Sequence, residues 1–403
     1  MRSAYLIVAL SALWGVFSHD AVAQEYEFEG PPSREVLDSY LARSMTTLGI
    51  LQGAGDLDDN IRLLTETGCK FAGRSFYRWG GEAKLPEMLP QAREAIEKIH
   101  AADPEIIVQA CAFEIVTWQV DELPVPARVF EAFDEPVVER TFCYEDMFSD
   151  WGRGHWSPAC SIPDISRPEA KRWFYYLATE EINIGCEAIH FGQVDLMARN
   201  DPERRHWDDV LTKVRAYAAE HARRKWVFCD GHVPKHGMVV DGRVLLDFHS
   251  FPMRIAEVKD RPLEGRLEMN RIDTIYGRSR GGVHPAGWTC EHTPYLVEFD
   301  NWGSSGRGGQ SIGEYWTWGY DEISWFAHQT EEYRNDWLRY AWTWIRENDP
   351  NGFLQMPGLR VLHDPPPDAP AYYYAHAPSE KTPDGFNQES TIREIWAADA
   401  ESD

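Results

Sequence analysis

Positive charge is scarce in this sequence, which holds 40 Lys and Arg residues against 65 Asp and Glu residues, for a net charge of −25. Nucleic acids and anionic lipids are bound by basic patches, because positive side chains release the counterions of the phosphates. The deficit therefore disfavours both as partners, and it suits a neutral substrate or simple solubility.

The seven cysteines include no C-x-x-C pair, which excludes zinc ribbons and thioredoxin chemistry. Cys143 and Cys160 flank a loop with little helix or strand pattern, so we expect a disulfide between them. An odd number of cysteines leaves at least one thiol unpaired. The thiols expected to be buried in apolar strand-like runs are Cys69, Cys111, Cys186 and Cys229.

Long apolar runs are also lacking, because the stretch from Ala4 to Phe17 is too short for an ordinary membrane-spanning helix. Arg2 precedes this stretch and Ala21-Val22-Ala23 follows it, which is the pattern of a secretory signal peptide rather than of a membrane anchor. We therefore expect residues 1–23 to be removed, and residues 24–403 to be exported as one domain without a membrane span.

What the sequence does contain is a regular alternation of short apolar runs with helical patterns. The strands are expected at 44–52, 70–76, 106–112, 188–193, 226–230, 244–249, 295–300 and 352–357. The clearest helices are expected at 57–67, 88–101, 168–184, 206–223 and 321–348. Eight strands with intervening helices predict an α/β fold, a (β/α)8 barrel. Because the pattern between residues 249 and 295 is weakly helical, an open doubly wound sheet is the alternative.

Two stretches are expected to be insertions on this barrel. Residues 120–165 follow the third strand and residues 301–320 follow the seventh, both at carboxyl ends of strands, where barrels build their active sites. The Pro-rich, aromatic segment after the eighth strand is expected to pack along the barrel as a C-terminal strap.

The seventh strand carries two acids. Glu298 and Asp300 share a face with Leu296, while Tyr295, Val297 and Phe299 form the other face. The bulky apolar face suits the surrounding helices, so the acids are expected to point into the mouth of the barrel. Buried carboxylates cost several kcal/mol unless they are paired. The alternatives are therefore a functional role or a salt bridge to Arg74 or Arg78.

The fourth strand is expected to turn His190 and Gly192 inward, with Gln193 and Asp195 at the rim. A glycine there would leave space for a substrate. His190 is equally consistent with a hydrogen-bonded core histidine, and Asp195 with a helix cap. Further titratable side chains are each a weak signal alone. Glu114 is expected just past strand three, Asp230 and His232 at the end of strand five, and Asp247 and His249 inward on strand six.

Aromatic residues indicate the substrate. Phe, Trp and Tyr make up 13% of the chain, and several fall in loops that follow the predicted strands. Aromatic faces beside carboxylates suit sugar rings, although such side chains also serve as plugs beneath loops. The loop aromatic residues are Tyr77, Trp79, Trp118, Trp151, Trp156, Trp302, Trp316 and Trp318.

With these features the chain resembles the exported (β/α)8 glycoside hydrolases, in particular the clan with an acid/base carboxyl after strand four and a nucleophile near the end of strand seven. Glu298, within YLVEFDNWG, matches the nucleophile position. The clan usually has Asn-Glu on strand four, where this chain has Gln193-Val194-Asp195. The resemblance implies Glu298 as nucleophile or base and Asp195 as acid, with Glu114 and Asp230 as substitutes for the acid.

A glycosidase needs no cofactor, and the separation of its two carboxyls decides between retention and inversion. The residues expected to contact the sugar are Arg74, Tyr77, Trp79, Trp118, His190, Gln193, His232, Asp247, His249, Asp300, Asn301, Trp302 and Trp316. Some arginines suit a local anionic subsite: Arg74, Arg78, Arg278 and Arg280. The sugar, the mode of attack and the oligomeric state stay open.

Two rival functions remain. A metal-dependent hydrolase would take its ligands from His190, Asp230, His232, Asp247 and His249, although the first strand lacks the His-x-His pair usual in metal-binding amidohydrolase barrels. A carbohydrate-binding barrel without catalysis is the second rival, and the missing Asn-Glu favours it.

Overall fold

The computed structural model describes residues 25–233, 235–274, 279–313 and 315–401. The predicted signal peptide, residues 1–23, and Arg278 lie outside the described residues. Within them, no helix has the length and apolar character needed to cross a membrane.

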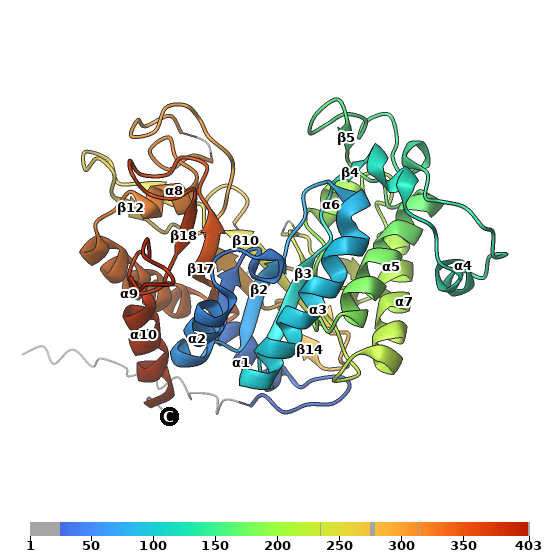
Figure 1. Ribbon diagram of the computed structural model, residues 1–403, viewed down its shortest axis with the longest axis horizontal. Helices are drawn as coiled ribbons and strands as arrows, with labels where there is room; N and C mark the ends of the chain where they lie inside the picture. The colour runs from blue at the N-terminus through green and yellow to red at the C-terminus, as the bar shows by residue number, and fades with distance from the viewer. Residues whose placement is uncertain (1–24, 234, 275–278, 314, 402–403) are drawn as a thin grey trace, which may run out of the picture.

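A curled sheet of ten strands forms the centre of the molecule (Figure 1). Its strands are β1 (Ser44–Thr47), β2 (Phe71–Phe76), β3 (Ile107–Cys111), β6 (Ala188–His190), β7 (Phe228–Gly231), β10 (Phe248–Pro252), β15 (Tyr295–Glu298), β16 (Gly352–Leu354), β17 (Met356–Val361) and β18 (Tyr372–Tyr374). The order is β16-β15-β10-β7-β6-β3-β2-β1-β17-β18. All neighbours pair in parallel except β17 and β18.

The hydrogen-bonded ladder returns on itself. Gln355 alone separates β16 from β17, yet β16 pairs with β15 while β17 pairs with β1. An open doubly wound sheet would instead keep its first and last strands apart. β18 continues the sheet beyond β17 and belongs to the segment expected to form the C-terminal strap.

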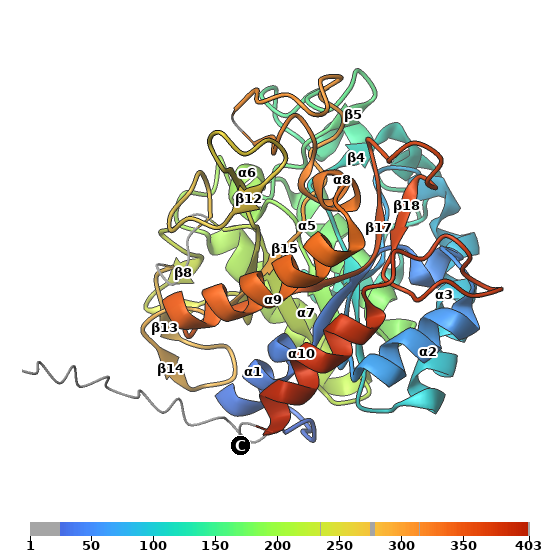
Figure 2. The same ribbon diagram turned by 90° about the vertical axis from the view of Figure 1, so that its left-hand side faces the viewer.

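Helices cover much of the outside of this sheet (Figures 1 and 2). They are α1 (Arg34–Ala42), α2 (Leu57–Thr67), α3 (Leu85–Ala102), α4 (Ala127–Ala132), α5 (Pro168–Asn183), α6 (Val194–Met197), α7 (Arg205–His221), α8 (Glu322–Ala327), α9 (Glu331–Asn348) and α10 (Glu389–Glu401). Short 3-10 turns span Ile50–Gln52, Glu82–Lys84, Trp118–Glu122 and Tyr144–Asp146.

Two of the eight connections depart from a regular β/α alternation. In the described residues no helix lies between β7 and β10 or between β10 and β15. Short strands occupy these segments instead: β8 (Val239–Val240), β9 (Arg243–Val244), β11 (Ala256–Glu257), β12 (Gly265–Arg266), β13 (Gly282–Val283) and β14 (Thr289–Cys290). Between β10 and β15 the lack of a helix among the described residues agrees with the weakly helical, Gly- and Arg-rich sequence between residues 249 and 295.

Local signals account for the helix boundaries. α2 has the bounds predicted from its spacing, because Asp56 caps its first turn and Gly68 ends it with a φ of 79°. The single helix predicted over 321–348 is wrong, since the chain forms two. Asp321 caps α8 and Thr330 caps α9, and the second cap starts a new helix.

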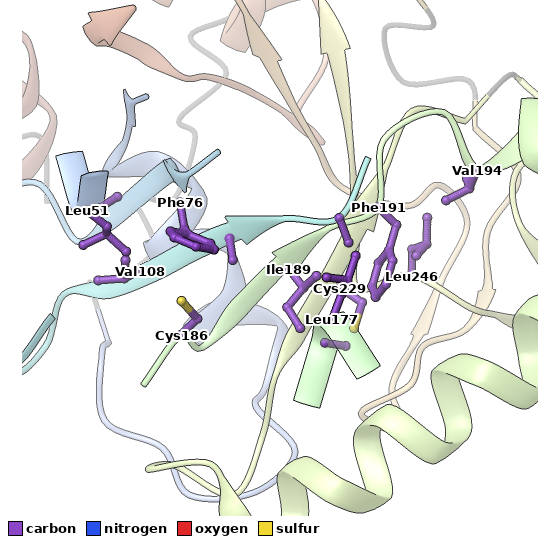
Figure 3. Packing of buried hydrophobic residues seen from close by; sticks show 14 of the residues in the cluster. Leu51, Phe76, Val108, Leu177, Cys186, Ile189, Phe191, Val194, Cys229 and Leu246 are labelled. Atoms are coloured by element: carbon purple, nitrogen blue, oxygen red, sulfur yellow. The ribbon is translucent and has the colours of Figure 1, made fainter. Parts of the chain in front are cut away.

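The outward faces of the strands pack against the helices (Figure 3). Ile189 and Phe191 point out from the fourth strand, and the ring of Phe191 lies 5.6 Å from that of Trp207 on α7. Phe299 packs in the same way against Phe326 of α8 and Trp337 of α9. The predicted outward faces of the fourth and seventh strands are therefore confirmed.

The inward faces begin with an apolar plug. Near the amino ends of the strands, side chains of the sheet meet α1, including its Leu37 and Tyr40. The inward members of this plug are Phe71, Ile107, Ala188, Phe228, Phe248, Leu296 and Phe353. Because side chains alternate along a strand, the residue two positions after each of these also points inward.

The insertion after the third strand contains the pair of strands β4 (Val116–Thr117) and β5 (Cys160–Ser161). The predicted disulfide in this region is wrong, because Cys143, Cys160 and the other five cysteines, all within the described residues, are free. Cys160 pairs with Thr117 in the β4–β5 ladder, and the Cys143 amide donates to Glu169. Backbone pairing, not a disulfide, therefore organises this loop.

Candidate functional site

A layer of polar side chains lies directly above the apolar plug, inside the curled sheet. We call it the polar layer, and it consists of Gln109, His190, Asp230, Ser250, Glu298 and Gln355, each two positions after a plug residue. All six are almost completely buried. Gly73 has the same position on β2, and a Cβ there would lie 2.2 Å from the Gln355 amide nitrogen. The interior at this level is therefore filled by polar side chains.

Glu298 lies between two arginines. Arg74 contacts Oε1, and Nη1 of Arg360 donates to Oε2 at 2.6 Å, while the Glu298 side chain is only 1% exposed. Burial raises the pKa of Glu298, but the charges of Arg74 and Arg360 outweigh it and hold the pKa below its ordinary value. Glu298 is thus an ionised carboxylate, and the predicted alternative of a salt bridge to Arg74 is part of its environment.

Arg74 reaches the interior through an irregularity in β2. The pairing register shifts between Ala72 and Phe76, and Arg74 has a φ of 60°, in the left-handed region that costs a non-glycine residue energy. Arg78, the other predicted partner, lies elsewhere, 3.9 Å from Glu82. Arg360, on β17, was not predicted at all, because its strand shows no acidic or motif signal.

The arginine contacts do not use the full bonding capacity of Glu298. A carboxylate has about four lone-pair sites, and two arginine nitrogens occupy two of them. Nε2 of His232 lies 4.0 Å from Oε1, and its side chain is 27% exposed. A partly exposed histidine therefore lies beside the buried carboxylate of Glu298.

Asp300 is held near Glu298 by a second arginine system. Nη1 of Arg254 donates to its carboxylate at 3.1 Å, and Arg360 lies 3.6 Å away. Burial raises the pKa of Asp300, but Arg254 and Arg360 reverse this effect and lower it. Glu322 of α8 accepts the amides of Met253, Ile255 and Asp300, so it ties together the loops after β10 and β15.

Asp230 has a contrasting environment. Its carboxyl group accepts hydrogen bonds from Gln109 at 2.7 Å and from Ser250 at 2.8 Å, and it lies 2.8 Å from Nδ1 of His190. Burial raises its pKa to about 7, against the opposing effect of Arg74. The pKa of His190 is held well below its usual range by burial and by Arg74, so this imidazole is neutral.

The glycine after the fourth strand does not leave space for a substrate, as the sequence suggested. Gly192 has a φ of 61°, and a Cβ there would lie 1.9 Å from Oε2 of Glu114. Glu114 accepts from the Gln193 amide at 2.9 Å and from its side chain at 2.7 Å. The space is therefore taken by Glu114, which holds the loop after β6 in place.

Asp195 belongs to a different group of side chains. It lies on α6, about a third exposed, and it forms an ion pair with Arg204 and a 3.2 Å contact with His236. Its carboxylate therefore has partners on the outer loops, whereas Glu298 and Asp230 bond within the polar layer. The structure does not bring the predicted acid Asp195 into the group that holds Glu298.

Two predicted inward residues of the sixth strand face the wrong way. Asp247 bonds to Arg215 of α7 at 2.9 Å, and His249 lies beside Phe251 on the outer face. Burial lowers the pKa of His249 to about 3. The inward residues are Phe248 and Ser250, because β10 begins at Phe248 and this phenylalanine joins the plug. The prediction assigned the wrong alternate set of side chains, Asp247 and His249, to the interior.

The outward orientation of Asp247 and His249 counts against the rival metal site. Its five predicted ligands are divided between the inner and outer faces of the sheet, with His190 and Asp230 inside and Asp247 and His249 outside. Over the described part of the chain, no group of three or more His, Cys, Asp and Glu side chains is arranged to hold a metal ion. The geometry therefore gives no support to the metal-dependent alternative.

Aromatic side chains form two groups around the polar layer. In the first, Trp79 lies 5.6 Å from Phe113 and 5.2 Å from Trp156, with Tyr77 against the same Phe113. Trp79 is 43% exposed. The sequence did not single out Phe113, which follows β3 and also contacts the ring of His190.

In the second group Trp302, 50% exposed, stacks on Tyr315 at 4.7 Å, and Arg254 lies over Tyr315. Asn301 beside it donates to the backbone of Val361. Of the other predicted loop residues, Trp118 is exposed, Trp316 is half-buried, Trp318 is buried and Trp151 lies under Arg199. Only part of the predicted aromatic set is therefore available to a ligand.

A cavity of about 630 Å³ lies away from the polar layer, at the start of α5. It is lined mainly by charged residues, among them Arg140, Glu169 and Arg172, which bond to one another. None of the predicted site residues lines it.

No protein-family model matches the sequence, and no curated protein is similar to it in sequence. Among solved structures, a debranching enzyme from Nostoc punctiforme is 10% identical, with a TM-score of 0.45, covering 93% of this chain and 82% of that one.

Two further structures are similar over about half of the chain. A GH27 β-L-arabinopyranosidase from Geobacillus stearothermophilus is 12% identical, with a TM-score of 0.30 over 52% of this chain and 54% of that one. An α-galactosidase from Thermus thermophilus is 14% identical, with a TM-score of 0.28 over 50% and 44%. Likeness at these identities and TM-scores carries no argument about activity.

The position of Gly192 leads to a stability prediction. Gly192→Ala is expected to lower the free energy of unfolding by about 2 kcal/mol or more, because the new Cβ meets Glu114 and the left-handed backbone is strained. Chemical denaturation measures the change. In a Glu114→Ala background the same substitution should cost less, and an equal cost in both backgrounds would contradict the contact.

The ion pairs of Glu298 with Arg74 and Arg360 lead to a second stability prediction. Glu298→Gln is expected to lower the free energy of unfolding by about 3 kcal/mol at neutral pH, because two buried arginines lose their counter-charge. The folded pKa of Glu298 lies below its ordinary value of 4.5. Its contribution is therefore complete above pH 4.5 and is lost as the pH falls through the folded pKa.

Denaturation of both proteins between pH 3 and pH 8 measures this difference. Glu145→Gln, at an exposed ion pair with Arg153, serves as the control and should leave stability nearly unchanged. A pH-independent difference between wild type and Glu298→Gln would show that the carboxylate charge is not what stabilises the fold.

Proposed function

We propose that this chain hydrolyses a glycosidic bond of a neutral carbohydrate at the mouth of the polar layer. The observation that carries the proposal is the opposite displacement of two carboxyl pKa values inside one layer. The pKa of Glu298 is lowered and that of Asp230 is raised to about 7, and the charge of Glu298 contributes to raising the pKa of Asp230. Carboxyl pairs with separated pKa values are how such sites divide acid and base roles.

The two groups have distinct roles in this proposal. Glu298, ionised and fixed by Arg74 and Arg360, attacks the anomeric carbon or activates the water that does. Asp230 holds the proton that the leaving oxygen needs, in place of the Asp195 expected from the sequence. Glu114 bonds to Gln193 and positions the loop after β6.

Charge balance around the site favours a neutral sugar. The arginines at the mouth are each matched by a carboxylate: Arg74 and Arg360 contact Glu298, and Arg254 contacts Asp300 and Asp273. No surplus of positive charge is left here for a sulfated or uronic polymer. The exposed rings of Trp79 and Trp302 provide faces on which sugar rings stack.

A barrel that binds carbohydrate without cleaving it is the second candidate. The 1% exposure of Glu298 and the occupation of both its oxygens by arginines favour it. Hydrolysis requires a neighbour such as His232 to move aside, whereas binding at the outer aromatic residues does not.

We also propose that residues 1–23 direct export, that residues 24–403 form one domain, and that its sheet derives from a (β/α)8 barrel. Expression of the full chain in a bacterium with a secretory pathway tests the first point. The exported protein is expected to begin near Gln24, as read by mass spectrometry of its N-terminal peptide. Retention of residues 1–23 on an exported or soluble protein would contradict cleavage.

Activity is tested on a panel of neutral polysaccharides by measuring released oligosaccharides. Glu298→Gln and Asp230→Asn are each expected to lower kcat at least about 100-fold, since general acid–base groups contribute that much or more. The rate should rise as Glu298 ionises below pH 4.5, and fall as the pH rises through about 7 and Asp230 loses its proton.

Glu145→Gln is the matched control at an exposed carboxylate. Asp195→Asn decides between the two acids, because a loss of similar size there, with Asp230→Asn active, would return the acid role to Asp195. Calorimetric binding of oligosaccharide with no released product from any polysaccharide would overturn hydrolysis and support the binding barrel.

A further inference from the structure

One atom of the polar layer has no hydrogen-bond partner among the described residues, and this is Nε2 of His190. The His190 ring is fully buried, 5.6 Å from the ring of Phe113 and 5.2 Å from that of His232. An unsatisfied buried nitrogen costs about 1–3 kcal/mol. The opposite ring nitrogen, by contrast, is bonded to Asp230.

The orientation of Asp230 limits where it can carry a proton. The backbone amide of Arg74 donates to Oε1 of Gln109 at 3.0 Å, which fixes the Gln109 amide so that its Nε2 donates to Oδ1 of Asp230. Oδ1 is thereby an acceptor. The proton of a neutral Asp230 must lie on Oδ2, which faces Nδ1 of His190 and the Ser250 hydroxyl.

This arrangement couples Asp230 to the far side of the imidazole. When Asp230 is ionised, Nδ1 of His190 donates to Oδ2, and Nε2 carries a lone pair. When Asp230 is protonated, Oδ2 donates to Nδ1, and the ring hydrogen lies on Nε2. The protonation state of the buried Asp230 carboxyl group therefore decides whether Nε2 of His190 is a hydrogen-bond donor or an acceptor.

We propose that His190 passes the proton of Asp230 to the substrate, with Nε2 donating to the glycosidic oxygen and with Asp230 and Ser250 as positioning residues. This inference rests on the proposed hydrolysis. It assigns the contact with the leaving oxygen to His190, because the two oxygens of Asp230 already bond to Gln109, Ser250 and His190, whereas Nε2 of His190 has no partner among the described residues.

The step is balanced in protons and electrons. The Nε2–H bond breaks as an O–H bond forms on the leaving oxygen, which takes the electron pair of the broken C–O bond. The hydrogen on Oδ2 of Asp230 moves to Nδ1, so Asp230 becomes the carboxylate and His190 stays neutral. The carbon is taken by the Glu298 carboxylate or by the water that Glu298 activates.

The groups around His190 favour a neutral imidazole ring. The charged and titratable groups that act on His190 come from four elements: Arg74 on β2, Glu298 on β15, Arg360 on β17 and His232 after β7. Burial and the positive charges among them disfavour an imidazolium ion. Passing one proton in at Nδ1 while another leaves Nε2 avoids forming that ion.

The tautomer of His190 can be measured in the free protein, without any sugar. In ¹⁵N-histidine-labelled protein, nitrogen chemical shifts are expected to show hydrogen on Nε2 at pH 5 and on Nδ1 at pH 9, with a midpoint near the Asp230 pKa of about 7. Asp230→Asn should hold the hydrogen on Nε2 at every pH, because its amide donates to Nδ1.

Ser250→Ala is the conservative comparison. The Ser250 hydroxyl lowers the pKa of Asp230, so its removal should keep the change of tautomer and move its midpoint to higher pH. A His190 ring that carries hydrogen on the same nitrogen throughout, or one that becomes an imidazolium ion in this range, would overturn the relay.

His190→Asn tests the transfer itself, because its side-chain amide keeps a contact with Asp230 and lacks the Nε2 position. The expected result is a fall in kcat of at least about 100-fold with little change in KM, and near-wild-type kcat would overturn the proposal. If the tautomer changes as expected and no polysaccharide is cleaved, the hydrolase assignment and the transfer to substrate both fall.

Discussion

The ion pairs of Glu298 with Arg74 and Arg360 are the constraint on which the interior depends. They join β15 to β2 and to β17 across the inside of the sheet. Three charges removed from water would cost several kcal/mol each if they were unpaired. The pairing of Glu298 with the two arginines offsets this cost. The left-handed backbone of Arg74 is a further cost that this arrangement offsets.

The charge of Arg74 affects the two carboxyl groups of the polar layer differently. Arg74 lies close enough to act on Glu298, Asp230 and His190 together. Glu298 gains direct contacts that outweigh its burial, whereas Asp230 has neutral hydrogen-bond donors and burial dominates. One cation thus supports two carboxyl groups in different protonation states, which is the basis of the chemistry proposed for this layer.

Sequence patterns predicted the inner face of the seventh strand and the outer face of the fourth, because bulky apolar residues mark the helix-facing side. They failed at the sixth strand, where polar residues occur on both faces, and the packing of Phe248 in the plug determines which face points inward. Arg360, the partners of Asp195 and the occupant of the space beside Gly192 depend on contacts between distant segments. No local spacing encodes such contacts, and the same holds for the disulfide that does not form.

The division of the last parallel strand at Gln355 has a consequence for how the chain assembles. β16 and β17 are the segments that join the two ends of the ladder, and they come late in the sequence. During synthesis the edges of β1 and β15 stay open until this segment emerges, and Glu298 has only one of its two arginines until Arg360 arrives. Joining of the ladder ends and formation of the second ion pair of Glu298 therefore both await this segment, in a topology whose long-range pairings make folding slow.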